Sequence, residues 1–317
     1  MPTLHCLGAV AVAAMLGFAG TTDAASREQL SGPPSGTPVL DLTFPSMPSW
    51  RHGPIPWPPL ARPFDDRAFM LGAGLTSGLR AAFGTAHGAA AAWASLPHEE
   101  EAYPNADAMR ELSIDPFSIH DGDLRIEATA MPAKAAGTLP ADMPRPYLSG
   151  ALNTYPFSQT YGYFEITARV PSGAGLWPAF WLLPVDQGWP PEIDVAEILG
   201  GNSRTAYFSL HSTDAAWVHA EAGSYNGSTT TDSGSPGDLS LQFHRYAVDW
   251  NPRTITFYLD DVAISRRTTP ADMNKPFYLI VNLAVGGPGS WAGPPDRRTR
   301  FPATLDIRSI RIWKQGR

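Results

Sequence analysis

The stretch GLWPAFWLLPVDQGWPPEIDVAEILG, residues 175–200, places three carboxylates within six residues, at Glu192, Asp194 and Glu197, directly after an aromatic, proline-rich approach. Acids this close repel one another and lose hydration on burial, so a folded protein gains little from them unless the repulsion tunes their proton affinity. The β-branched and apolar residues between the acids favour a strand. We therefore interpret the stretch as a catalytic strand, with a solvated acidic strand edge as the alternative.

Strand geometry places a condition on this interpretation. Side chains alternate between the two faces of a strand, so Glu192 and Asp194 share a face whereas Glu197 points away. A β-bulge at Val195–Ala196 returns Glu197 to the face of the other two acids. The two Glu backbones then lie roughly 13 Å apart at about 3.3 Å per residue, and long side chains leaning inward reduce the gap between their carboxyl groups. Retaining glycosidases use about 5 to 5.5 Å between carboxyl groups.

Glycoside hydrolysis gives each acid a role. We expect Glu192 to be the nucleophile that forms a covalent glycosyl-enzyme intermediate, and Glu197 to be first the general acid and then the general base. Asp194, between them on the same face, is expected to hydrogen-bond one Glu and to help hold the two pKa values apart.

Further strands are legible from residue 122 onward. Apolar and polar residues alternate over 123–130 and again over 163–170, and apolar runs occur at 254–259 and 277–284. In the last run, 304–313, the apolar residues change parity between Ile307 and Ile310, which indicates a second bulge. Short strands at such spacing predict a β-sandwich.

Several blocks give the chain a family resemblance between Leu112 and Lys314. It resembles the laminarinase-like part of glycoside hydrolase family 16, in the branch with the bulged, six-residue acidic motif. The matching blocks are LSGALNT (148–154), YGYFE (161–165), GLWPAFWLLP (175–184), WPPEIDVAEILG (189–200), YAVDW (246–250) and NLAVGG (282–287). The resemblance implies an all-β fold, a jelly-roll (concanavalin A-like) sandwich of two antiparallel sheets with a concave substrate cleft. It also implies retaining endo-hydrolysis of a β-linked polysaccharide, with the roles given above to the three acids.

One departure from the family pattern bears on the substrate. Gly150 and Ala151 stand where many laminarinases have Arg after Ser. The block is more similar to that of secreted bacterial glycanases that act on exopolysaccharides of mixed β linkage. The acids of the segment 98–103 also depart from the pattern, and we interpret them as a solvated turn.

Seven residues are candidates for substrate binding. Exposed indoles stack on sugar rings, although large aromatics also fill β cores, so core packing is the alternative for each Trp. His211 is expected to touch substrate or Asp194, with a structural hydrogen bond as the alternative. The candidates are Trp177, Trp181, Trp189, Trp291, His211, Asn153 and Glu165.

Composition excludes other functions. The formal net charge of −7 and the lack of basic runs argue against nucleic acid as a partner. No cysteine pair, HExxH motif or glycine-rich phosphate loop is present, so we expect no cofactor. The family resemblance permits a structural Ca²⁺ on the convex face, but no residue pattern fixes it. Gly at 29 and Pro at 32 residues indicate many turns, as a β-sandwich needs.

The amino-terminal region divides into two segments. Residues 1–25 resemble a signal peptide, with an apolar stretch from Leu7 to Gly20 and small residues after it, although a basic start is missing. The stretch is too short to span a bilayer, so we expect no membrane partner and a secreted or periplasmic protein. Residues 26–63 are rich in Pro and Gly and are predicted to be a linker that becomes a wrapping strand near 39–44. Residues 64–317 then form a single catalytic domain, expected to be a monomer.

The sequence thus predicts a secreted, endo-acting, retaining β-glycanase for a β-1,3(4)-glucan or a related bacterial exopolysaccharide. A transglycosylase using the same site is the first alternative. A lectin-like protein that binds carbohydrate without turnover and a structural protein of the biofilm matrix are the others.

Overall fold

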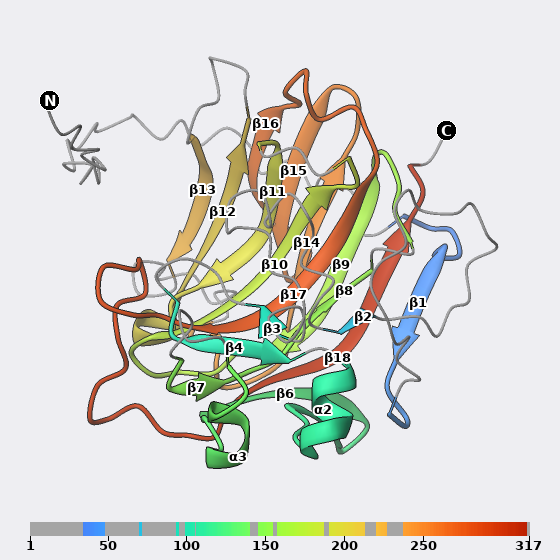
Figure 1. The fold of residues 1–317 in the computed structure, drawn as a ribbon. Helices are drawn as coiled ribbons and strands as arrows, with labels where there is room; N and C mark the ends of the chain where they lie inside the picture. The colour runs from blue at the N-terminus through green and yellow to red at the C-terminus, as the bar shows by residue number, and fades with distance from the viewer. Residues whose placement is uncertain are drawn as a thin grey trace, which may run out of the picture.

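The computed structural model describes residues 34–47, 70–71, 93–94, 99–104, 106–139, 145–154, 157–186, 190–212, 220–226 and 237–315. In this part of the chain two β-sheets lie face to face and two short helices lie at one end (Figure 1). The neighbouring strands are antiparallel with one exception, β4 beside β7. The predicted jelly-roll sandwich is confirmed.

The larger sheet has the order β16-β15-β14-β9-β18-β6-β7-β4-β3, with β1 added to β18 and β5 to β6. Its strands are β1 (Leu40–Thr43), β3 (Trp93–Ala94), β4 (Glu101–Pro104), β5 (Phe117–His120), β6 (Asp123–Ala130), β7 (Tyr147–Leu148), β9 (Gly162–Arg169), β14 (His244–Trp250), β15 (Thr254–Leu259), β16 (Val262–Thr268) and β18 (Ala303–Trp313).

The smaller sheet has the order β13-β12-β11-β10-β17-β8-β2. Its strands are β2 (Met70–Leu71), β8 (Ala151–Asn153), β10 (Leu176–Pro184), β11 (Glu192–Ile198), β12 (Thr205–His211), β13 (Ala220–Asn226) and β17 (Phe277–Val285). The helices are α2 (Ala106–Leu112) and α3 (Ala133–Ala136), with a 3₁₀ turn at Gly200–Asn202. Within the ranges above, no helix has the length and apolar character needed to cross a membrane.

One continuous apolar core fills the space between the sheets. Alternation along each strand sends every second side chain into this core, as with Phe164 and Ile166 on β9 and Phe180 and Leu182 on β10. The opposite face of β10 carries Trp177 and other residues outside this core. We call that face of the smaller sheet, turned away from the core, the site face.

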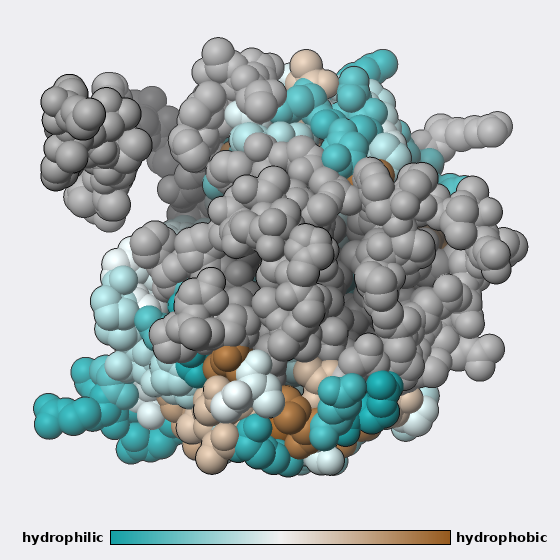
Figure 2. All heavy atoms as spheres, in the orientation of Figure 1, coloured by the Kyte–Doolittle hydropathy of each residue, from teal (hydrophilic) through white to brown (hydrophobic). Residues whose placement is uncertain are grey.

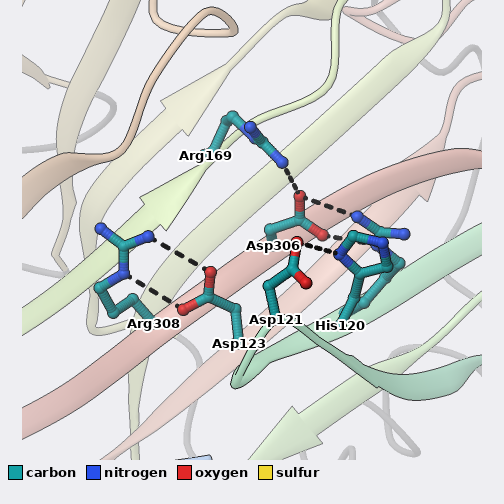
Figure 3. Close-up of polar contacts among 7 residues, drawn as sticks. His120, Asp121, Asp123, Arg169, Asp306 and Arg308 are labelled. Carbon is teal, nitrogen blue, oxygen red and sulfur yellow. Dashed lines mark hydrogen bonds and ion pairs between the residues drawn. The ribbon is translucent and has the colours of Figure 1, made fainter.

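The predicted bulge in the last strand is also present. The pairing of β18 with β9 shifts register between Ile307 and Ser309, so that Arg308 is the extra residue. The outer face of the larger sheet carries a ladder of ion pairs at this point (Figure 3). The buried Asp306 accepts from Arg125 Nε at 2.7 Å and from Arg169 Nη2 at 2.5 Å, and Arg308 Nε lies 3.2 Å from Asp123.

Of the predictions for the amino-terminal region, the structure tests only the wrapping strand. The wrapping strand expected near residues 39–44 is β1, which pairs with β18. The signal peptide and the boundary at residue 64 lie outside the described residues and stay predictions.

In the view of Figure 2, hydrophilic side chains gather at the two ends of the sandwich, with some apolar area at the lower end.

The interpretation of residues 98–103 as a solvated turn was wrong. Glu99 and Glu101 are 4% and 0% exposed, and the segment leads into β4. The carboxylate of Glu101 accepts the backbone N–H of Val285 at 2.7 Å, and Tyr103 Oη donates to Glu99 at 3.4 Å. Glu99 and Glu101 are therefore buried within the fold, one beside a residue four positions along the chain and the other against the distant backbone of β17.

Candidate active site

The three acids of β11 lie on the site face because the strand is bulged. Against β12, Asp194 faces Ser209 and Glu197 faces Tyr207, so residues 195 and 196 together oppose a single residue. Val195 and Ala196 both point into the core, as do Ile193 and Ile198. The bulge predicted from the parity of the acids is confirmed, and it sends all three carboxylates to the opposite side from these core residues.

His211 forms an ion pair with the middle acid. It lies directly across from Glu192 on β12, and its Nε2 is 3.0 Å from Asp194 Oδ2 and 3.9 Å from Glu192 Oε1. Burial lowers the pKa of His211, but the contact with Asp194 and the charge of Glu192 outweigh it and raise this pKa to about 9. Burial and the nearby Glu197 raise the pKa of Asp194, which His211 opposes. At neutral pH a positive imidazolium therefore lies among the three acids.

Glu197 has a different environment. Burial, followed by the negative charge of Glu192, raises the pKa of Glu197 to about 7. Trp177 Nε1 donates a hydrogen bond to Glu197 Oε1 at 3.0 Å, which favours the ionised form and opposes that rise. Glu197 thus holds a proton up to about neutral pH. A carboxyl group that still holds its proton near neutral pH is suited to act as a general acid.

Aromatic side chains from three elements surround Glu197. Trp291, in the loop after β17, packs edge-on against Trp177 with ring centroids 5.8 Å apart and against Tyr207 at 4.6 Å. Trp291 is 49% exposed, so much of its ring is open to a ligand. Sequence reasoning missed Tyr207, although it lies four residues before His211 on the same face of the same strand, and alternation would have indicated it.

Two other candidates lie on the site face but are buried. Trp181, across from Asp194 on β10, is 7% exposed and donates from Nε1 to Asn282 Oδ1 at 2.9 Å, which leaves little of its ring to meet a sugar. Asn153 on β8 faces Ile280 of β17 and is 1% exposed. Trp181 therefore lies beside the acids, whereas two strands, β10 and β17, separate Asn153 from them.

The structure places Glu165 away from the site. Glu165 lies on β9 of the larger sheet between two core residues, so its side chain points to the outer face of that sheet. There it is buried near Arg245 and Arg311, and burial raises its pKa. A role in sugar binding does not fit this position. Trp189 lies outside the described residues.

One group in the described part of the chain has ligand atoms spaced for a metal ion. Glu192, Asp194 and His211 offer three such atoms within 4.8 Å of one another. The imidazolium of His211 already balances the charge of the carboxylates, so we assign no cation to this group. The absence of a cofactor and the structural Ca²⁺ both stay predictions.

In comparisons with known proteins, the chain is similar to two bacterial endo-1,3-1,4-β-glycanases. The chain is 44% identical over 193 residues to the endo-1,3-1,4-β-glycanase ExsH of Rhizobium meliloti (strain 1021), covering 60% of this chain and 38% of that protein. It is 42% identical over 212 residues to the endo-1,3-1,4-β-glycanase EglC of the same organism, covering 67% and 42%. The chain thus spans about two fifths of the length of these relatives.

Among solved structures, the laminarinase catalytic domain of Thermotoga maritima MSB8 superposes with a TM-score of 0.57 at 29% identity, covering 69% of this chain and 84% of that one. The family model for glycosyl hydrolases family 16 matches residues 117–304, more than half of the chain, and includes β11 with its bulge and all three acids. The chain belongs to glycosyl hydrolases family 16.

Proposed function

We propose that this protein is an endo-acting, retaining β-glycanase that hydrolyses a β-1,3(4)-glucan or a related bacterial exopolysaccharide. The observation that carries the proposal is the pair Glu192 and Glu197 on one face of β11, the second with a pKa of about 7. The relatives named as endo-1,3-1,4-β-glycanases and laminarinases support the substrate class.

In the first step Glu192 attacks the anomeric carbon of the sugar. A bond forms between a Glu192 oxygen and that carbon while the bond to the glycosidic oxygen breaks, and Glu197 gives its proton to the departing oxygen. A general acid with a pKa near 7 is still protonated at neutral pH, whereas a carboxyl with the ordinary value of 4.5 is almost fully ionised there. The raised pKa of Glu197 therefore suits this step.

In the second step the roles of the proton change. Glu192 becomes an ester when the intermediate forms, so it loses the negative charge that helped to raise the pKa of Glu197. The pKa of Glu197 then falls, and its carboxylate can take a proton from the water that attacks the anomeric carbon. The loss of the Glu192 charge thus changes Glu197 from an acid to a base within one turnover.

Asp194 and His211 hold the charge balance of the site. The imidazolium of His211 lies 3.0 Å from Asp194 and 3.9 Å from Glu192, so it stabilises negative charge on both carboxylates. Asp194 is buried between the nucleophile and the acid and stays in place through this contact. We infer that the two residues keep Glu192 ionised and ready to attack.

Trp291 is the candidate for sugar stacking that fits best. Its half-exposed ring stands beside Glu197, where a sugar unit next to the cleaved bond would lie. Gly150 and Ala151 stand where many laminarinases have Arg after Ser, and Ala151 lies on the site face opposite Asn282. A substrate recognised without that cation favours the mixed-linkage or exopolysaccharide class, and we propose export of the protein to meet it.

The test is release of reducing sugar by the purified protein from laminarin, mixed-linkage β-glucan and a succinoglycan-type exopolysaccharide. Glu192→Gln, which keeps the size of the side chain and removes its nucleophile, is the matched control. Release that is lost in the variant supports the proposal and identifies the polymer class. Binding of polymer without release by the wild type would favour the lectin-like alternative. Products in which an added acceptor sugar is extended by units from the polymer would favour transglycosylation.

A further inference from the structure

Trp177 makes a contact that sugar stacking does not explain. It lies on β10, two residues before Ala179, and Ala179 is directly across from Glu197. Trp177 is therefore a diagonal neighbour of Glu197 on the site face, within reach of its carboxyl group. Its indole Nε1 points at the carboxyl group and donates to Oε1 at 3.0 Å.

The chemistry of this contact distinguishes the two carboxyl oxygens. An indole N–H is a donor only, so it pairs best with the oxygen that carries no proton. We propose that Trp177 is a positioning residue for the general acid: its N–H holds Oε1 of Glu197 as the acceptor, so that the transferable proton sits on Oε2. This inference rests on the proposed function, because it assigns the proton that Glu197 gives to the leaving group.

The indole is held in this orientation from the far side. The ring of Trp177 meets the edge of Trp291 at an interplanar angle of 86°. Trp291 belongs to a loop that begins at Gly286, whose N–H donates to the carbonyl of Gly175, two residues before Trp177, at 2.7 Å. A Cβ at Gly286 would lie 2.5 Å from the carbonyl oxygen of Gly293, so only glycine fits the closed loop.

The contacts continue from Trp291 to Tyr207 and so return to β11. Tyr207 packs on Trp291 at 4.6 Å and is directly across from Glu197. A sugar that meets the open face of Trp291 therefore presses on the same group of rings that orients the acid. Placement of the proton is thus linked to occupation of the site beside it.

The experiment compares wild type and Trp177→Phe on two substrates over pH 4 to 10. One is the polysaccharide, and the other is an aryl β-glycoside with a 2,4-dinitrophenolate leaving group, whose departure needs no proton. We expect the alkaline limb of kcat/KM on the polysaccharide to move upward by about one pH unit, because the variant loses a hydrogen bond to the ionised carboxylate. At pH 5, where Glu197 is protonated in both proteins, kcat/KM should still fall on the order of tenfold on the polysaccharide and less than about twofold on the aryl glycoside.

The controls separate this role from a loss of packing. Trp313→Phe, on β18 of the larger sheet, loses an indole hydrogen bond of 2.7 Å to the carbonyl of Gly36 and should not move the alkaline limb. Replacement of Trp177 by β-(3-benzothienyl)alanine keeps the shape of the ring without the N–H and should reproduce the effect if the Phe variant folds poorly.

Two results would overturn the inference while the proposed function stands. One is an alkaline limb that stays in place in both Trp177 variants, and the other is an equal loss on both substrates. Wild-type protein that cleaves neither substrate would overturn the proposed function, and the positioning role with it.

Discussion

The substitution Glu197→Gln tests the central step of the mechanism. The carboxyl group has its pKa raised from 4.5 to about 7, which corresponds to about 3 kcal/mol of preference for the protonated form. At pH 7 about half of the Glu197 population then carries a proton, against about 0.3% for an ordinary carboxyl, so burial and the charge of Glu192 supply about 150-fold more acid at that pH. The acid form is complete well below pH 7 and is lost as the pH rises through about 7.

The expected result follows from which step needs this proton. Glu197→Gln should lose on the order of 10² to 10⁴ in kcat/KM on polysaccharide, because a poor leaving group needs the acid. With a dinitrophenyl glycoside the variant should still release a burst of dinitrophenolate and accumulate an adduct on Glu192, because the second step lacks its base. The alkaline limb near pH 7 should be absent from its burst rate constants.

Stopped-flow absorbance measures the burst, and peptide mass spectrometry locates the adduct. Added azide, which needs no general base, should restore turnover in Glu197→Gln and give a β-glycosyl azide. Glu192→Gln is the control and should show neither burst nor adduct. An alkaline limb near pH 7 that persists in Glu197→Gln would refute the reasoning, because the titrating group would then be another residue.

Three further predictions concern the charges around the site and the fold. Asp194→Asn should lower the pKa of His211 from about 9, because the contact with this carboxylate raises it, and an unchanged imidazole titration by NMR would contradict the pairing. Burial raises the pKa of Glu99 well above 4.5, so its contribution to stability is full below pH 4.5 and decreases as the pH rises. Glu99→Gln should therefore match wild type at pH 4 and melt at a higher temperature at pH 8, with a gain of up to about 1.4 kcal/mol for each pH unit between 4.5 and the raised pKa. Equal melting curves of the two proteins at pH 8 would contradict this prediction. Asp306→Asn, which leaves two arginines without their buried partner, should cost about 3 kcal/mol in urea unfolding, whereas Asp123→Asn, with a half-exposed partner, should cost less than about 1 kcal/mol; similar losses would contradict this ranking.

Local rules of strand geometry predicted what lies within one strand. The parity of Glu192 and Glu197 required a bulge, and the parity of Ile307 and Ile310 required another, since alternation depends only on neighbouring residues. Glu165 could have been excluded in part by the same rule, because the apolar residues on either side of it are core residues. Alternation does not say which sheet a strand joins, so the distance of Glu165 from the acids needed the structure.

Contacts between distant segments could not be predicted in this way. The acids at the start of β4 resembled a solvated turn because the partner of Glu101, the N–H of Val285, is 184 residues away along the chain. Trp177 was expected to stack on sugar, since composition cannot tell an indole that faces ligand from one whose N–H faces a carboxylate. His211 was expected to touch substrate or Asp194 because it follows the catalytic strand and the family resemblance places a histidine in the cleft there, and the structure gives 3.0 Å between His211 and Asp194.

The bulge in β11 has a consequence beyond the face on which Glu197 lies. If the last Glu stood two residues after Asp194 on a regular strand, all three acids would also lie on the site face. The extra residue gives the core two consecutive side chains, Val195 and Ala196, and because two residues of β11 then oppose one residue of each neighbouring strand, Glu197 keeps the position along those strands that the unbulged spacing would give it. That position is across from Ala179 and Tyr207, where the N–H of Trp177 reaches the carboxyl group. The bulge therefore adds an apolar side chain to the core and still leaves Glu197 where the N–H of Trp177 opposes the rise in its pKa and, as proposed above, orients its proton.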